Sequence, residues 1–323
     1  MASVKLSPVA TSSLSSDGGL YDSVSYYYYD FWQDNSHPVT GRLPLVDGGP
    51  WKLFGLIWLY YMFVRHWGPA YMKDRPAYDL KKWMLVHNIF LVLLNGICFS
   101  IAVPFSNFGI STWSCKKYDH TSSYAGEHIL MLMGYTYYVS KFFDLADTVF
   151  FVLRKKQRNV SGLHVFHHAV MPFAGWVGLK FSAYHCAGFI PFVNAFIHTI
   201  MYTYYALAAL GRHDILWWKK YLTQMQMVQF VAITSHAVFF LRWTSFDSGC
   251  DWPRIFPILE GLHGALFFYL FFSFYRHNYM GNNKTSNGVT PSVNSSMASH
   301  NNGINKSLAS PDDIITSRKV KSS

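Results

Sequence analysis

Three histidines near the middle of the chain are the residues best suited to chemistry. His164, His167 and His168 form an HxxHH motif at the start of the apolar run 163–185, which is long enough to cross a bilayer. On a helix these positions share one face, so three imidazole rings project together. Ionisable groups inside membrane segments are costly and usually line a cavity or relay. The motif therefore predicts a functional site, the structural alternative being histidines that bond only to neighbouring helices.

Polar residues recur at helical spacing in three further apolar segments. Lys141, Asp144 and Asp147 lie on one stripe, and Lys141 can pair with Asp144 one turn later. Two other segments carry one polar face each: Asn194, His198, Met201, Tyr202 and Tyr205 in the first, and Thr223, Gln226 and Gln229 in the second. Taken singly, each set is also explained by hydrogen bonds between helices.

The composition is that of a membrane protein. Of the 323 residues, 51% are hydrophobic and only 14% are charged, whereas a soluble domain carries about 25% charged residues. The apolar residues form stretches near the roughly 20 residues that a bilayer requires. We therefore predict an all-α, polytopic membrane protein with seven transmembrane helices. They are expected at 52–66, 84–105, 128–152, 163–185, 188–209, 219–241 and 254–275.

Lysine and arginine concentrate in alternate loops, most clearly in 154–158. The positive-inside rule places these loops and the C-terminus in the cytosol and the N-terminus in an organelle lumen. The net charge of +10 reflects this bias, so no nucleic-acid partner is expected. Lys319 and Lys321, close to the last residue given, match a dilysine retrieval signal, which predicts the endoplasmic reticulum membrane.

The polar faces are expected to meet. At 1.5 Å per residue, Asp147, His167, His198 and Gln226 all fall in the cytosolic half of their helices. Four helices thus bring polar groups to one layer, which predicts a buried reaction chamber with a cytosolic mouth.

In their order along the chain, the four motifs (141–147, 164–168, 194–205 and 223–229) resemble the signature of the fatty acid elongases, the very-long-chain 3-oxoacyl-CoA synthases of the endoplasmic reticulum. The resemblance runs from about Leu43 to Tyr279. One departure is Asp144, where the family usually has Glu. The expected organisation is a lumenal tail over 1–45, a seven-helix elongase domain over 46–279 and a disordered cytosolic tail over 280–323.

The resemblance implies a reaction that joins acyl-CoA to malonyl-CoA, with loss of CO₂ and CoA and no metal or cofactor. No cysteine lies in the polar layer, so histidine is the best available nucleophile. We expect an acyl-imidazole on His167, with His168 or His198 as the alternatives, and an enolate stabilised by amide and imidazole donors. The predicted catalytic set is His164, His167, His168, His198, Lys141, Asp144, Asp147, Asn194, Gln226 and Gln229.

The phosphates of CoA require cations at the mouth of the chamber. The expected residues are Arg154, Lys155, Lys156, Lys219 and Lys220, with Tyr202 and Tyr205. The alternative is that these cations only reflect the positive-inside bias of cytosolic loops and bind no substrate. The acyl chain would extend toward the lumen through an apolar tunnel. Expected partners are the two CoA substrates, the reductases and dehydratase of the elongation cycle, and a second copy of the chain.

The cysteines are expected to differ by compartment. Cys115 and Cys250 fall in predicted lumenal loops, where disulfides persist, and should be bridged. Cys186 is the competitor for this pairing. Cys98 lies in an apolar helix and is expected to be a packing thiol.

Two other classes share some of these features. Membrane di-iron desaturases and hydroxylases use HxxHH boxes because imidazoles ligate iron, but they carry several such boxes and this chain has one. A seven-helix transporter or receptor accounts for the charged residues of 141–147 but not for four motifs in register.

Overall fold

The computed structural model describes residues 24–246 and 249–280, and within these ranges it contains helices and no strand. A short helical segment, η1 (Tyr26–Asp30) followed by α2 (Phe31–Asp34), comes first. The long helices are α3 (Trp51–Met62), continued by η3 (Phe63–Trp67) and α4 (Gly68–Met72), then α5 (Lys81–Phe105), α6 (Ala125–Leu153), α7 (Gly162–Phe181), α8 (Phe189–Ala209), α9 (Lys219–Phe246) and α10 (Ile255–Tyr275). The all-α prediction is confirmed for the described chain.

The first long helix is longer than the sequence predicts. Arg65 and His66 do not end it, because the chain passes through a π-helical turn at 63–67 and stays helical to Met72. Both side chains are exposed there, so neither charge is buried inside the bundle.

Two other helices end at different residues than predicted. α7 stops at Phe181 rather than 185, since the following segment bonds to another loop: Tyr118 N donates to Ala183 O at 3.0 Å and His185 N to Lys116 O at 2.9 Å. α9 continues to Phe246, beyond the predicted 241.

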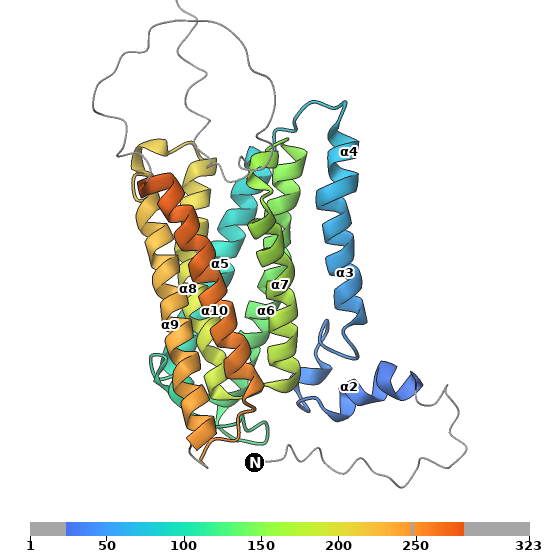
Figure 1. The fold of residues 1–323 in the computed structure, drawn as a ribbon, viewed down its shortest axis with the longest axis vertical. Coiled ribbons are helices and arrows are strands. Elements are labelled where there is room, and N and C mark those ends of the chain that lie inside the picture. The colour runs from blue at the N-terminus through green and yellow to red at the C-terminus, as the bar shows by residue number, and fades with distance from the viewer. Residues whose placement is uncertain (1–23, 247–248, 281–323) are drawn as a thin grey trace, which may run out of the picture.

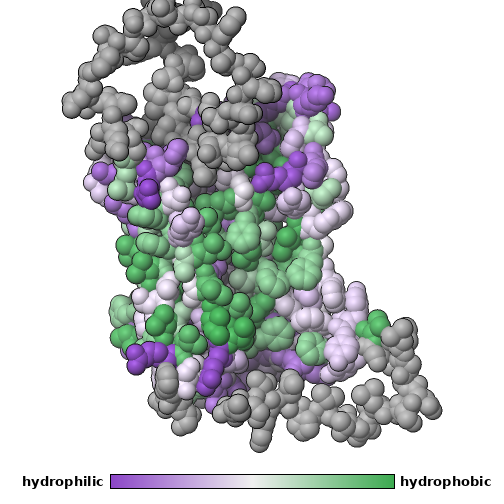
Figure 2. Space-filling view, viewed as in Figure 1, coloured by the Kyte–Doolittle hydropathy of each residue, from purple (hydrophilic) through white to green (hydrophobic). Residues whose placement is uncertain are grey.

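Among the residues that the structure describes, three helical stretches are long and apolar enough to cross a membrane: Lys81–Phe105, Cys186–Ala209 and Ile255–Met280. Figure 2 shows hydrophobic side chains gathered across the middle of the visible face, with hydrophilic side chains above and below. This pattern is that of a membrane protein, because an apolar band matches the hydrocarbon layer. The other four predicted spans remain a prediction.

The helices α5 to α10 surround a common interior (Figure 1). Their spatial order is α7, α6, α5, α8, α9 and α10, each packed against the next, and α3 lies outside them against α7. The helices α9 and α10 approach each other closely at Gly264, where glycine has no Cβ. A Cβ at this position would lie 2.5 Å from Thr234 Oγ1. Both α7 and α10 contribute side chains to the wall of a cavity.

The described part of the predicted N-terminal tail is not free. Lys180, whose side chain is fully buried at the end of α7, donates from Nζ to Gly41 O at 3.1 Å and to Val46 O at 3.3 Å. Thr40 Oγ1 donates to Leu179 O at 2.6 Å. A charged side chain at this position would ordinarily be expected in solvent, but here it fixes the segment before α3 to the bundle.

Replacing Lys180 by methionine should loosen this attachment. The substitution keeps the apolar stem but leaves two carbonyl groups without their donor, which we expect to lower the local opening free energy of residues 37–46 by about 1–3 kcal/mol. Hydrogen exchange read by mass spectrometry measures this. Lys52→Met, at an exposed position on α3, is the matched control. Equal exchange of the segment in both variants would show that Lys180 does not hold it.

Cys115 and Cys250 are joined by a disulfide, with Cα atoms 5.3 Å apart across a sequence separation of 135. The bridge links the loop after α5 to the loop before α10. Cys98 and Cys186 are free and buried. This pairing is the one that the sequence predicts, and Cys186 packs beside Cys250 without joining it.

Peptide mapping under non-reducing conditions should recover the Cys115–Cys250 link. Reduction should lower the free energy of unfolding by about 2–4 kcal/mol, since the bridge restricts a long loop in the unfolded chain. The Cys186→Ser variant should keep both the link and this sensitivity. Free thiols at positions 115 and 250, or a link to Cys186, would contradict the assignment.

Candidate active site

Lys141 is the centre of a buried polar cluster between α6 and α8. Its side chain is 1% exposed, and its Nζ donates to Asp144 Oδ2 at 2.8 Å. The same nitrogen lies 3.3 Å from His198 Nδ1 and 3.5 Å from Asn194 Oδ1. The three-residue spacing on α6 accounts for the ion pair, and the neighbouring face of α8 supplies the other two groups. The buried ammonium is therefore paired, as a charge in this position must be.

The lysine fixes the proton of His198. An ammonium group only donates, so Nδ1 of His198 accepts and Nε2 carries the hydrogen. Asp144 Oδ2 lies farther from Nδ1, at 3.6 Å. Asn194 Oδ1 also accepts from the Tyr137 hydroxyl at 3.0 Å, which orients its amide N–H group away from the lysine. In the part of the chain that the structure describes, neither His198 Nε2–H nor the side-chain N–H group of Asn194 donates to another side chain.

Tyr202 joins the two carboxylates of α6. Its hydroxyl lies 3.0 Å from Asp144 Oδ1 and 2.9 Å from Asp147 Oδ2. Sequence reasoning placed Tyr202 at the CoA mouth, but its side chain is fully buried in the polar cluster. The reason is its position one turn after His198, on the face of α8 that meets α6.

His87 on α5 belongs to the same cluster and was missed. Its Nε2 lies 3.2 Å from Asp147 Oδ1, and its ring is largely buried. A lone ionisable side chain inside an apolar predicted span was the only signal for it in the sequence. Tyr137 was also missed. Only the hydrogen bond from its hydroxyl group to Asn194 sets it apart from the other aromatic residues, and the sequence carries no signal for that contact.

The HxxHH motif opens α7. Ser161 caps the helix, its Oγ accepting from His164 N at 3.1 Å. The ring of His164 is tied to two other helices, because its Nε2 lies 2.9 Å from Thr148 Oγ1, which lies 2.8 Å from Tyr60 Oη. This first histidine therefore acts as a link between α7, α6 and α3.

The other two imidazoles are not tied in this way. The rings of His167 and His168 lie 5.4 Å apart, and within residues 24–246 and 249–280 no side chain hydrogen-bonds to either. His167 also packs edge-on against Phe267 at 5.0 Å, which lines the cavity. An imidazole without a bonding partner beside a cavity has the lone pair that a nucleophile requires.

Two predicted donors lie away from this cluster. Gln226 Nε2 is 3.6 Å from Met201 Sδ, and Gln229 is buried beside a separate apolar groove between α8 and α9. Among the described residues, the structure brings neither glutamine into hydrogen-bond contact with Lys141 or the histidines. The predicted role of both glutamines as donors therefore stays a prediction.

The predicted CoA-binding cations lie at one end of the bundle, at the α6–α7 and α8–α9 connections (Figure 1). Arg154 Nη1 is 2.9 Å from Met84 Sδ, and Lys155 Nζ donates to Lys73 O at 3.2 Å. The other members are the exposed Lys156, Lys220 and Tyr205 and the half-buried Lys219. The ammonium group of Lys220 lies over the Tyr221 ring.

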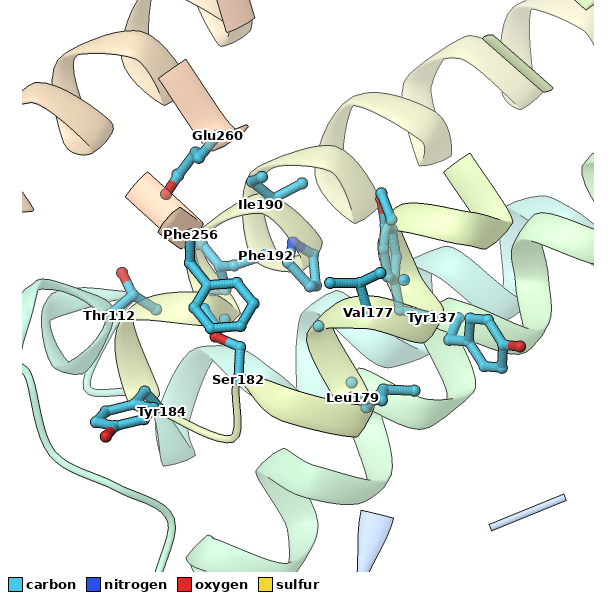
Figure 3. Close-up of a pocket in the computed structure, with 18 of the residues that line it drawn as sticks. Thr112, Tyr137, Val177, Leu179, Ser182, Tyr184, Ile190, Phe192, Phe256 and Glu260 are labelled. Carbon is cyan, nitrogen blue, oxygen red and sulfur yellow. The ribbon is translucent and has the colours of Figure 1, made fainter. Parts of the chain in front are cut away.

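The structure contains a cavity of about 530 Å³, and Figure 3 shows some of the residues that line it. Side chains of α5, α6, α7, α8 and α10 line it, most of them apolar. Tyr137 and Phe267 are part of its wall and also contact Asn194 and His167, respectively. The cavity therefore reaches the polar cluster and has the size and lining of a site for an apolar ligand.

Comparison with known proteins assigns the chain to a family. The sequence model of the ELO: GNS1/SUR4 family matches residues 46–287, most of the chain. The chain belongs to this family. The chain is also similar to the very long chain fatty acid elongase 7 of Drosophila melanogaster, 35% identical over 78% of this chain and 77% of the relative. The elongase 7 of Rattus norvegicus is 36% identical over 78% and 89%. The elongase 1 of Homo sapiens is 34% identical over 76% and 87%.

The family match covers the region predicted to be the elongase domain. It begins at residue 46, just after the segment held by Lys180, and ends at 287. The proposed retrieval signal at Lys319 and Lys321 lies outside both the match and the described residues.

Proposed function

We propose that this protein is the condensing enzyme of very-long-chain fatty acid elongation, a 3-oxoacyl-CoA synthase. One observation carries the proposal. His167, an imidazole without a side-chain hydrogen bond among the described residues, packs against Phe267 of the cavity wall, and the same cavity reaches the buried Lys141–Asp144–His198 cluster through Tyr137. Membership of a family whose named relatives are elongases supports it.

The first step transfers the acyl group to His167. The unprotonated ring nitrogen attacks the thioester carbonyl, the new C–N bond forms, and the C–S bond breaks to release CoA. The acyl chain occupies the cavity. His168 and His198 are the alternative carriers, but Lys141 already engages one nitrogen of His198.

The second step uses malonyl-CoA. Loss of CO₂ leaves an enolate, whose carbon attacks the acyl carbonyl, forming the C–C bond and breaking the C–N bond to His167. The enolate oxygen requires preorganised donors. We assign this role to His198 Nε2–H and the amide of Asn194, and Lys141 holds the required tautomer of His198.

The setting of the reaction is part of the proposal. Seven helices span the endoplasmic reticulum membrane, with the N-terminus in the lumen and the C-terminus in the cytosol. Arg154, Lys155, Lys156, Lys219 and Lys220 bind the CoA phosphates at the cytosolic mouth. The product passes to the reductases and dehydratase of the elongation cycle, and the enzyme works as a homodimer.

Purified protein in lipid nanodiscs, supplied with acyl-CoA and malonyl-CoA, tests the proposal. Mass spectrometry should find a 3-oxoacyl-CoA two carbons longer, formed only when malonyl-CoA is present. No malonyl-dependent product across a range of acyl lengths would contradict it. A desaturated or hydroxylated product together with bound iron would favour the oxygenase class.

A further inference from the structure

One end of the cavity is polar. Most of its wall is apolar, but Thr112, Ser182, Tyr184 and Glu260 line the end away from Tyr137 (Figure 3). A methyl-terminated acyl chain offers these groups no hydrogen bond, and covering polar groups without one is costly. The polar end therefore indicates a ligand that carries a polar group of its own.

Glu260 is the ionisable member of this set, and one of its carboxyl oxygens has no hydrogen-bond partner among the described residues. Thr112 and Tyr184 donate their hydroxyl protons to backbone carbonyls 2.6 and 3.1 Å away. Ser182 Oγ accepts from the indole of Trp252 at 2.7 Å. The carboxyl group of Glu260 is 7% exposed, and its only hydrogen bond among the described residues uses Oε1.

The partner of Glu260 determines what its second oxygen can do. His236 Nδ1 lies 2.9 Å from Glu260 Oε1, and His236 Nε2 lies 3.0 Å from Thr112 O. A carbonyl oxygen only accepts, so Nε2 carries a proton. Nδ1 then either donates to an ionised Glu260 or accepts from a protonated one. In both states Oε2 of Glu260 remains an acceptor, so the matching ligand group is a donor.

We propose that this end of the cavity binds a hydroxyl group at the far end of the acyl chain, which donates to Glu260 Oε2. The inference rests on the proposed function, because it takes the cavity as the acyl site. Glu260 precedes Phe267, the neighbour of His167, by seven residues on α10, about 10 Å along the helix. A hydroxyl that reaches Glu260 must therefore lie well away from the thioester, as the terminal hydroxyl of an ω-hydroxyacyl-CoA of matching length does.

The test compares ω-hydroxyacyl-CoAs with methyl-terminated acyl-CoAs of equal carbon number over a series of lengths. Both are measured with one preparation of full-length enzyme, so partial misfolding cancels in the ratio of kcat/KM. At the length that reaches Glu260, the wild-type ratio should favour the hydroxylated chain on the order of tenfold. Glu260→Leu should bring the ratio to about one or below, and Glu260→Gln, which keeps an acceptor oxygen, should give an intermediate value.

A matched control is Glu127→Gln. Glu127 is also a buried carboxylate, bonded to Lys116 and His185, but it does not line the cavity, so its ratio should equal that of wild type. A wild-type ratio near one at every length, or ratios unchanged in both Glu260 variants, would overturn the inference alone. Absence of elongation for every acyl-CoA would instead contradict the proposed function itself.

Discussion

Replacing His167 by alanine should reduce condensation by roughly a thousandfold or more, because it removes the proposed nucleophile. The ring makes no hydrogen bond within the described chain, so its loss should leave the fold and membrane insertion intact. Single-turnover assays of purified variants measure the effect. His66→Ala, at an exposed position, is the control and should retain full activity.

The same assay distinguishes the histidines of the motif. His164→Ala should lower activity less than His167→Ala, since His164 links helices through Thr148 rather than facing the cavity. Full turnover by His167→Ala, with an acyl adduct mapped to another residue, would move the covalent step away from His167.

Breaking the Lys141–Asp144 pair should destabilise the protein by about 3–5 kcal/mol, because either single substitution leaves an uncompensated buried charge. Asp144→Asn and Lys141→Met should therefore unfold at lower denaturant concentration and lose condensation. Asp144→Glu, the residue usual in the family, should keep both the pair and the activity.

A double variant separates stability from chemistry. Lys141→Met with Asp144→Leu removes both charges and should recover most of the lost stability, since an apolar pair can replace a buried ion pair. Activity should not return, because His198 then lacks the donor that fixes its tautomer. Recovery of activity in this double variant would show that the ion pair is structural only.

The helices and their polar faces were predictable because apolar periodicity is a local property of the chain. The spacing of Lys141 and Asp144 predicted their pairing, and the loops of Cys115 and Cys250 predicted the bridge. The direction in which a face points depends on how the helices rotate when they pack. For this reason Tyr202 was placed at the mouth although it bridges two carboxylates.

Other parts of the structure had no periodic signal. His87 is a single ionisable residue in an apolar helix, and its meeting with Asp147 follows only from the packing of α5 on α6. The segment before α3 is irregular, so its attachment through Lys180 depends on contacts about 135 residues apart in sequence. Long-range contacts of this kind are set by the whole fold.

The most direct test of the account is the order in which the products appear. Enzyme mixed with acyl-CoA alone should release free CoA rapidly, up to one equivalent per active site, because His167 takes the acyl group before malonyl-CoA binds. His167→Ala should release none, and mass spectrometry of the wild-type protein should find the acyl group on the peptide containing His167. If CoA appears only when both substrates are present, the covalent histidine intermediate is wrong and malonyl-CoA attacks the bound thioester directly.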